Sequence, residues 1–183
     1  GDVVAFIVAE SLMMAKYAAE LIEIEYEILP SIKSTADAVK KGASLVWENC
    51  PKYECFIFEV GDSKTTYKII STANHVTKLE NQINRVSANS METRVSIGNF
   101  DHQKNRYKLL TNTQNVHGIR DQVAAMLNVP LSQVRVIAGD VGGALGIKGN
   151  IYHDQILVLW ASKLLNRPVR WTADRTEYLM SDN

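Results

Sequence analysis

Residues 107–148, YKLLTNTQNVHGIRDQVAAMLNVPLSQVRVIAGDVGGALGIK, decide how this chain is interpreted. Apolar and β-branched side chains fill residues 107–113, which predicts a strand. Apolar residues then recur at helical spacing, which predicts an amphipathic helix that ends before Pro130. The short apolar run 134–138 is typical of a second, buried strand. A strand, helix and strand of this length imply parallel pairing through a right-handed crossover.

A glycine-rich turn, Gly142-Gly143-Ala144-Leu145-Gly146, follows the second strand. Glycines let backbone N–H groups converge and let a ligand approach without Cβ atoms in the way. The turn precedes a predicted helix over residues 152–165, and helix N-termini favour anions. The pattern matches neither G-x-G-x-x-G nor a Walker A loop, so a nucleotide-binding domain is the weaker hypothesis. A tight structural turn and an anion-binding loop both remain open from the motif alone.

One polar side chain lies where the first strand of this unit ends. Gln114 comes directly after residues 107–113, and the glycine turn comes after residues 134–138. Ligands of open parallel sheets bind beyond the carboxyl ends of the strands. The sequence therefore predicts that a side-chain amide and a glycine-rich backbone face one pocket.

The remaining patterns predict a mixed α/β (α+β) fold. The apolar and alternating runs predict further strands at residues 3–9, 22–28, 56–58, 75–84, 95–100 and 169–172. Helices are expected after Ser11, at residues 34–41 and 63–70, and from Asp174 onward. Residues 95–100 and 107–113 should pair as a hairpin. Trp160 is expected in the core.

Composition excludes several classes of protein. The 183 residues are 46% hydrophobic and 22% charged with zero net charge, so neither a nucleic acid nor a membrane is an expected partner. No signal peptide is recognisable, and a cytoplasmic location is expected. Cys50 and Cys55 are expected to be reduced thiols, with a disulfide as the alternative. The four histidines lack ligand spacing, so we expect no metal ion held by protein side chains.

Several motifs, in this order along the chain, resemble one family. They are Asn84-Arg85, Met91-Glu92-x-Arg94, Thr113-Gln114-Asn115-x-His117-Gly118-x-Arg120, Asp140-Val141-Gly142-Gly143-x-x-Gly146-x-Lys148 and Arg167-Pro168-Val169-x-Trp171-x-x-Asp174-Arg175-x-Glu177. Together they look like the molybdenum-binding large subunit of the xanthine dehydrogenase, aldehyde oxidase and carbon monoxide dehydrogenase family. The chain then resembles a fragment of such a subunit. Residues 1–55 would be the C-terminal part of a hammerhead-like α/β domain, and residues 56–183 the N-terminal part of the molybdenum-cofactor-binding domain.

The resemblance implies a molybdenum–molybdopterin cofactor, with the cytosine dinucleotide form as one option. Gln114 matches a glutamine whose amide faces an oxo ligand of molybdenum, and Gly142, Gly143, Ala144, Leu145 and Gly146 match the loop around the pterin. The usual Gly-Gly-Gly-Phe-Gly is altered here at Ala144 and Leu145. A positive φ at Ala144 would cost about 1 kcal/mol or more, which leaves cofactor binding open.

The resemblance also implies partners and a reaction. Oxidative hydroxylation of carbon monoxide, a purine, an aldehyde or an N-heterocycle would need the rest of the large subunit and iron–sulfur and FAD subunits or domains. The glutamate base of the family lies further downstream, so we expect this polypeptide alone not to turn over substrate. The alternative is a degenerate or truncated relative that acts as a non-catalytic scaffold. Arg85, Glu92 and Arg94 would be either a functional charged cluster or structural salt bridges.

Overall fold

The computed structural model describes residues 2–50, 56–84 and 86–181, so Arg85 and Cys55 lie outside the described residues. Contacts divide the chain into two units, one containing residues 23–83 and the other containing the flanking segments on either side. Each unit is described by itself. The predicted domain boundary at residue 55 stays a prediction. Cys50 is a free, half-buried thiol.

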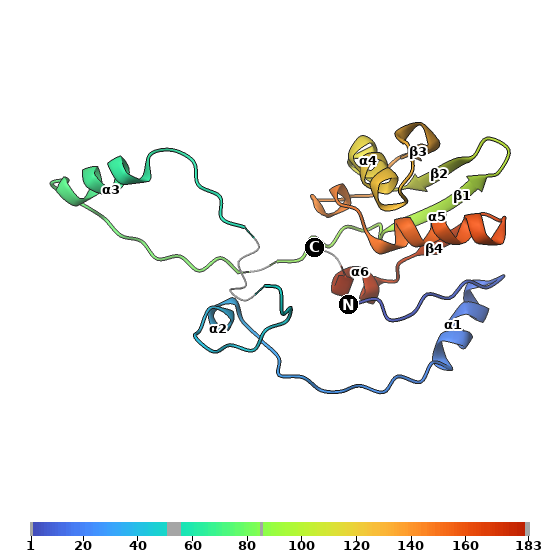
Figure 1. The fold of residues 1–183 in the computed structure, drawn as a ribbon, viewed down its shortest axis with the longest axis horizontal. Helices are drawn as coiled ribbons and strands as arrows, with labels where there is room; N and C mark the ends of the chain where they lie inside the picture. The colour runs from blue at the N-terminus through green and yellow to red at the C-terminus, as the bar shows by residue number, and fades with distance from the viewer. Residues whose placement is uncertain (1, 51–55, 85, 182–183) are drawn as a thin grey trace. The chain divides into compact units, whose positions relative to one another are not determined.

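The larger unit contains a four-stranded sheet (Figure 1). Its strands are β1 (Val95–Asp101), β2 (Arg106–Thr111), β3 (Val134–Ile137) and β4 (Val169–Thr172), in the order β3-β2-β1-β4. β1 pairs with β2 and β4 in antiparallel fashion, whereas β2 and β3 are parallel. The predicted hairpin and the predicted parallel pair are therefore confirmed.

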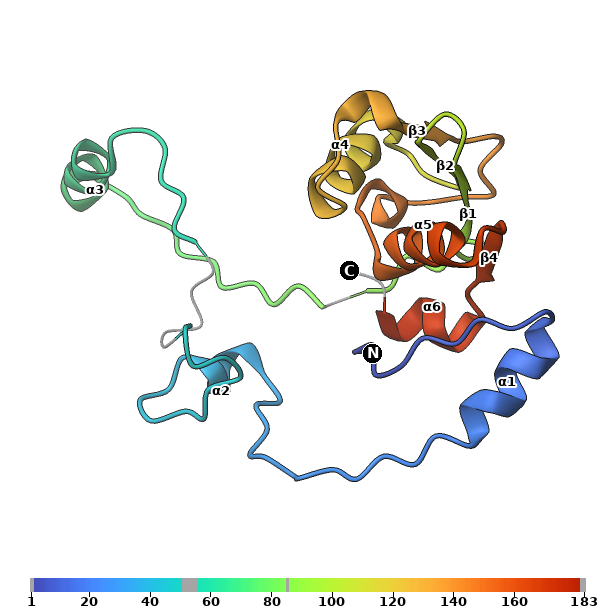
Figure 2. The same ribbon diagram turned by 45° about the vertical axis from the view of Figure 1, so that its right-hand side comes forward.

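Two helices, α4 (Val116–Met126) and α5 (His153–Leu165), cover the sheet and close the core (Figure 2). The buried apolar residues come from all four strands and both helices, namely Phe100, Tyr107, Leu109, Ile119, Val123, Ala124, Val134, Val158, Leu159, Ala161 and Val169. Gly98 of β1 lets α5 approach closely, because a Cβ there would lie 2.5 Å from the carbonyl carbon of Val158.

The expectation that Trp160 is a core residue is wrong, since half of it (50%) is exposed. The buried side of α5 carries Val158, Leu159 and Ser162. Trp160 lies seven residues after His153 and four before Leu164, so these three share the exposed side of the helix.

Four predicted strands, at residues 3–9, 22–28, 56–58 and 75–84, are not strands in the structure. The described residues of these segments have no regular secondary structure and pair with no neighbouring strand. An alternating pattern creates a strand only where a second strand satisfies its backbone groups. Local sequence could not show that the partner is missing.

The predicted helices are present, and the predicted cap at Ser11 is confirmed, but the helix expected over residues 34–41 covers only residues 35–38. α1 (Leu12–Glu20) begins at Ser11, whose hydroxyl accepts the Met14 N–H at 3.2 Å. In the smaller unit, α2 (Thr35–Ala38) is capped by Ser34 and α3 (Ser63–Thr72) by Asp62. The larger unit also contains α6 (Arg175–Ser181) and two short 3₁₀ helices, η1 (Leu131–Gln133) and η2 (Ile147–Gly149).

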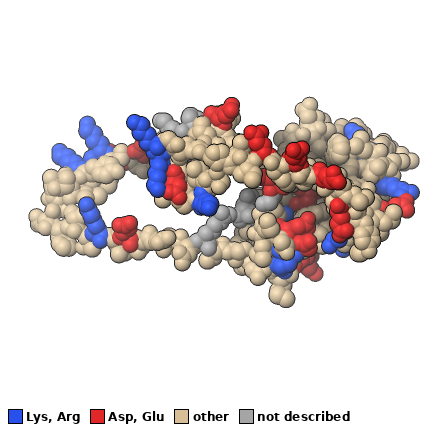
Figure 3. All heavy atoms as spheres, turned by 90° about the horizontal axis from the view of Figure 1, so that it is seen from below, with Lys and Arg blue, Asp and Glu red and all other residues tan. Residues whose placement is uncertain are grey.

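Charged side chains of both signs appear on the face drawn in Figure 3. This mixture agrees with a formal net charge of zero. None of the helices in the described ranges combines the length and apolar character that crossing a lipid bilayer requires.

Candidate functional site

Gln114 and the glycine turn meet at one end of the parallel strand pair. The turn follows β3 after a short connection, and Gln114 follows β2 after Asn112 and Thr113. The backbone N–H of Gly146 donates to Gln114 Oε1 at 3.2 Å. The amide and the glycine-rich backbone that were predicted to face one pocket are therefore in contact, while the pocket itself stays a prediction. We call Gln114 and residues 142–146 the rim.

The contact with Gly146 also fixes which end of the Gln114 amide is available. A backbone N–H is a donor only, so the atom that faces it must be the carbonyl oxygen of the side chain. None of the hydrogen bonds found among the described residues uses the Gln114 amide nitrogen. The Gln114 side chain is exposed. The rim therefore presents a neutral N–H donor to an oxygen acceptor on a ligand.

The turn has left-handed backbone at three positions, Gly143 (φ 95°), Leu145 (φ 55°) and Gly146 (φ 101°). Ala144 is outside the positive-φ region, so the strain expected for Ala144 falls on the next residue instead. Ala144 is buried (8% exposed), whereas Leu145 is 74% exposed. A Cβ at Gly146 would meet nothing within 4 Å, so the backbone there is open to a ligand.

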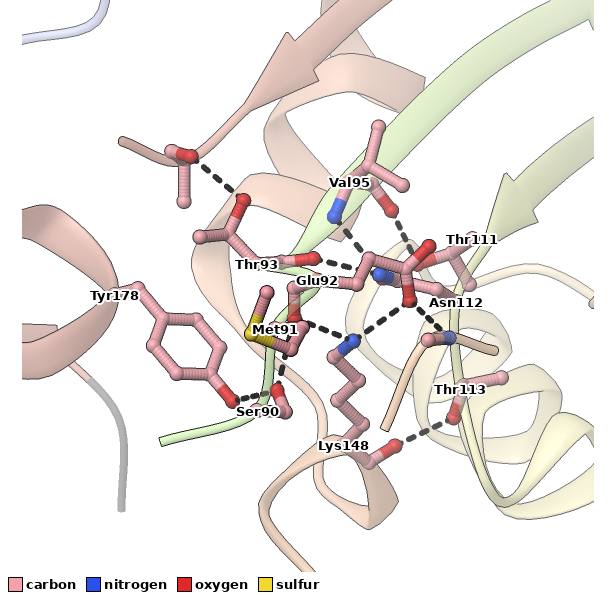
Figure 4. A network of polar contacts seen from close by, with 12 residues as sticks. Ser90, Met91, Glu92, Thr93, Val95, Thr111, Asn112, Thr113, Lys148 and Tyr178 are labelled. Carbon is pink, nitrogen blue, oxygen red and sulfur yellow. Dashed lines mark hydrogen bonds and ion pairs between the residues drawn. The ribbon is translucent and has the colours of Figure 1, made fainter. Parts of the chain in front are cut away.

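Beneath the rim, Glu92 and Lys148 form an ion pair (Figure 4). Lys148 Nζ donates to Glu92 Oε2 at 2.8 Å and to the Glu92 carbonyl at 2.9 Å. The same Oε2 accepts the Gly142 N–H at 2.8 Å, and the Glu92 N–H donates to the Gly142 carbonyl at 3.1 Å. Glu92 therefore holds both Gly142, at the start of the turn, and Lys148, just after it.

The two charges differ in their exposure. The Lys148 side chain is 1% exposed and that of Glu92 is 35% exposed. Burial acts to raise the pKa of the Glu92 carboxyl, but hydrogen bonds from Lys148, Asn112 and Gly142 outweigh it and hold that pKa below its ordinary value. The carboxylate is thus ionised opposite a buried ammonium. Because that ammonium faces inward, Lys148 does not act as a phosphate-binding lysine at the surface.

The backbone of Lys148 links this pair to the rim. Its carbonyl accepts the Gln114 N–H at 3.1 Å and the Thr113 hydroxyl at 2.8 Å. One residue therefore contacts Glu92 through its side chain and Gln114 through its main chain. Sequence reasoning did not find this pairing, because 56 residues separate Glu92 from Lys148 and no local period connects them. Both residues nevertheless belong to the motifs quoted above.

Arg94 takes a structural position in the same region. Its Nε lies 3.5 Å from Asp154 Oδ1, and its guanidinium stacks 3.9 Å above the ring centroid of Tyr152. Burial raises the pKa of the Asp154 carboxyl, against the opposing influence of the Ser96 hydroxyl and the Arg94 charge. Of the two alternatives for the charged residues, Glu92 and Arg94 both form ion pairs, while Arg85 lies outside the described residues.

The described residues do not supply a protein-ligated metal centre. No three His, Cys, Asp or Glu side chains in that part of the chain gather as ligands. The rim offers an amide N–H and open backbone instead, which suits a group that brings its own oxygen acceptors.

Comparison with known proteins places this rim in a family. The model of the molybdopterin cofactor-binding domain matches residues 46–183, which include every residue of the rim. The chain belongs to this family. It corresponds to part of the molybdenum-binding large subunit of the xanthine dehydrogenase, aldehyde oxidase and carbon monoxide dehydrogenase group, so the predicted family is confirmed.

Relatives of the family domain are parts of larger assemblies. The carbon monoxide dehydrogenase large chain of Afipia carboxidovorans is 32% identical over 96% of this chain and 23% of its own length. Subunit gamma of the 6-hydroxypseudooxynicotine dehydrogenase complex of Paenarthrobacter nicotinovorans is 30% identical over 99% of this chain and 22% of its own length. The chain thus spans less than a quarter of these relatives.

Solved structures show the same fold. The crystal structure of the Cu,Mo-containing carbon monoxide dehydrogenase superposes with a TM-score of 0.85, at 29% identity, over 96% of this chain and 24% of the other. Quinoline 2-oxidoreductase from Pseudomonas putida 86 superposes with a TM-score of 0.77, at 29% identity, over 93% of this chain and 21% of the other. The mixed α/β fold of this chain therefore matches a portion of a molybdenum-dependent dehydrogenase.

Proposed function

We propose that this chain supplies part of the molybdenum-cofactor site of a molybdenum hydroxylase large subunit, with Gln114 and the 142–146 turn as its cofactor-binding residues. The hydrogen bond from Gly146 to Gln114 carries the proposal, because it joins the two predicted halves of the site. Membership of the molybdopterin cofactor-binding family supports it.

The rim fits such a cofactor by its donors and by its open backbone. The Gln114 amide would donate to an oxygen bound to the metal, and the backbone at Gly146 would lie against the pterin without a Cβ in the way. When bound, the cofactor supplies the redox metal for oxidative hydroxylation. This part of the chain contributes binding and orientation.

The wider assignment follows from the same family membership. Residues 1–55 would complete a hammerhead-like domain and residues 56–183 would begin the cofactor domain. The remainder of the large subunit, together with iron–sulfur and FAD subunits or domains, would complete the enzyme. Its substrate would be carbon monoxide, a purine, an aldehyde or an N-heterocycle, and its cofactor could take the cytosine dinucleotide form.

A second candidate is a relative that has lost the cofactor and serves as a folded scaffold. The left-handed backbone of Leu145 favours this candidate, because a non-glycine residue there costs about 1 kcal/mol or more. The absence of a positive φ at Ala144 removes the other argument for it. The intact contact between Gln114 and Gly146 favours the first candidate.

Metal analysis tests the proposal. The large subunit that contains this segment is expressed with its partner subunits in a molybdenum-replete host. Molybdenum is measured by plasma mass spectrometry alongside the fluorescence of the oxidised pterin. We expect both in the wild type and neither in Gln114→Glu, whose carboxylate keeps an acceptor for Gly146 but loses the N–H donor. Gln122→Glu, on an exposed turn of α4, is the matched control and should retain both. A wild-type chain without molybdenum and pterin would favour the scaffold.

A further inference from the structure

The 142–146 turn contacts the charged pair beneath it at its first residue. Gly142 donates its N–H to Glu92 Oε2 and receives the Glu92 N–H at its own carbonyl. A Cβ at Gly142 would lie 2.6 Å from the Glu92 Cβ, so the stem of that side chain lies directly against the turn.

Beyond its last residue, the turn is held by Lys148. The Lys148 ammonium is fixed by two oxygens of Glu92, and the Lys148 carbonyl holds the Gln114 N–H. Gln114 in turn accepts the Gly146 N–H. The contacts form a closed circuit that runs from Glu92 through Gly142 and the turn to Gln114, and back through Lys148.

Both charges of the pair are engaged with each other, and the carboxylate is also engaged with the turn. The Lys148 side chain is 1% exposed, and the Glu92 oxygen that it contacts is already shared with Gly142. A buried ion pair is weak evidence for stability, because hydrophobic residues of similar volume can replace it with little loss. Its directional contacts to the turn, however, cannot be replaced by hydrophobic side chains.

We propose that Glu92 and Lys148 are positioning residues, which fix the 142–146 turn and the Gln114 amide in the geometry that the cofactor requires. The proposal rests on the proposed function of the rim. Glu92 supplies a carboxylate that holds the turn at Gly142, and Lys148 transmits the same constraint to Gln114. The pair acts through these two elements and does not touch the cofactor itself.

Residue-resolved amide hydrogen exchange by NMR tests this positioning role. In Glu92→Gln the Gly142 and Gly146 amides should exchange about tenfold faster or more, as expected when a charge-assisted hydrogen bond is weakened. Amides in the hairpin of β1 and β2 should keep their rates. Exchange of the two glycine amides at the wild-type rate would overturn the proposal.

A double variant separates positioning from simple charge compensation. Glu92→Met with Lys148→Met removes both charges together, so the hairpin should stay protected even if Glu92→Gln fails to fold. The turn should still exchange about tenfold faster, because its acceptor is gone. Recovery of turn protection in this double variant would show a merely structural pair and overturn the proposal. Glu10→Met with Arg167→Met, an exposed ion pair at 3.4 Å, is the matched control.

The hydrogen-exchange experiment can be carried out whether or not the chain contains cofactor. A chain that lacks molybdenum but shows faster exchange only in the turn of the variants would refute the proposed function and leave the constraint on the turn in place. A chain that contains molybdenum and whose turn does not respond to either variant would refute the positioning role and leave the proposed function standing.

Discussion

Replacing Gly142 with alanine should break the connection between the charged pair and the turn. The new Cβ would lie 2.6 Å from the Glu92 Cβ, whereas ordinary contacts begin at 3.4 Å, so a displacement of 3.4 − 2.6 = 0.8 Å is needed. The Glu92 Cβ is next to the main chain and cannot swing away as the tip of a long side chain could. Gly142 is not in the positive-φ region, so the effect is steric and not conformational.

The size of the effect follows from the two hydrogen bonds that meet at Glu92 Oε2. Both are 2.8 Å long, and a displacement of 0.8 Å would stretch either one to 3.6 Å, which is outside hydrogen-bonding range. Overpacking costs about 1–3 kcal/mol and a charged hydrogen bond contributes about 1.5–3 kcal/mol. Because the Glu92 side chain is 35% exposed, we take the lower part of these ranges. The expected loss is about 2 kcal/mol, or roughly 30-fold in the opening equilibrium of the turn.

Hydrogen exchange of the Gly146 amide and molybdenum content would both record this change. Gly139→Ala is the matched control, since a Cβ there would meet nothing within 4 Å and Gly139 also lies outside the positive-φ region. We expect the control to behave as the wild type. If both alanine variants exchange within twofold of each other, the steric reasoning is refuted and Glu92 does not constrain the turn.

Three further predictions concern stability. Gly98→Ala should destabilise the sheet unit by about 3 kcal/mol in urea unfolding, because its Cβ would lie 2.5 Å from the Val158 backbone; a loss below about 0.5 kcal/mol would contradict the close approach of α5. Folding lowers the pKa of the Glu92 carboxyl from 4.5, so its ionised form stabilises the fold above pH 4.5, and this stabilisation is lost as the pH falls below that value. In Glu92→Gln the free energy of unfolding should therefore depend less steeply on pH in the acid range. The same steepness as in the wild type would contradict this. Arg175→Lys should speed proteolysis next to Met91. The Arg175 guanidinium donates hydrogen bonds of 2.8 Å to the Asn89 side chain and to the Ser90 and Met91 carbonyls, and lysine cannot reproduce all three. Cleavage at the wild-type rate would count against that role.

Local sequence was sufficient for three of the four strands with their pairing, and for one half of the candidate site, but it did not predict that β4 pairs with β1. The hydrophobic patterns of residues 95–111 and 116–137 predicted the hairpin, the crossover helix and the parallel pair. These could be predicted because each is formed by segments that are close together in the sequence. Gln114 could be found because strand ends and ligand sites coincide in parallel sheets. Its contact with Gly146 follows from that topology.

The parts that sequence reasoning missed depend on partners far away in the chain. Residues 22–28 alternate between apolar and charged side chains as a strand should. No strand pairs with them among the residues described, so they do not form a strand. Glu92 and Lys148 form their ion pair although 56 residues separate them, and no periodic pattern in the sequence predicts that contact. The non-glycine residue with left-handed backbone in the turn is Leu145 and not Ala144, where sequence reasoning had expected the strain. Each miss concerns a property that the segment does not determine by itself.

The inward lysine leaves the rim supported from beneath without placing an ammonium at its surface. A turn that offers backbone N–H groups to a ligand has few internal hydrogen bonds of its own, so it needs support from outside. A surface ammonium would give that support but would also attract any anion in solution. In this chain the ammonium is buried against Glu92, and Gln114 offers only a neutral donor. If the rim binds the cofactor as proposed, discrimination would come from the shape of the turn and the direction of one amide. The contacts that fix Gly142 and Gln114 should then matter as much as the rim itself.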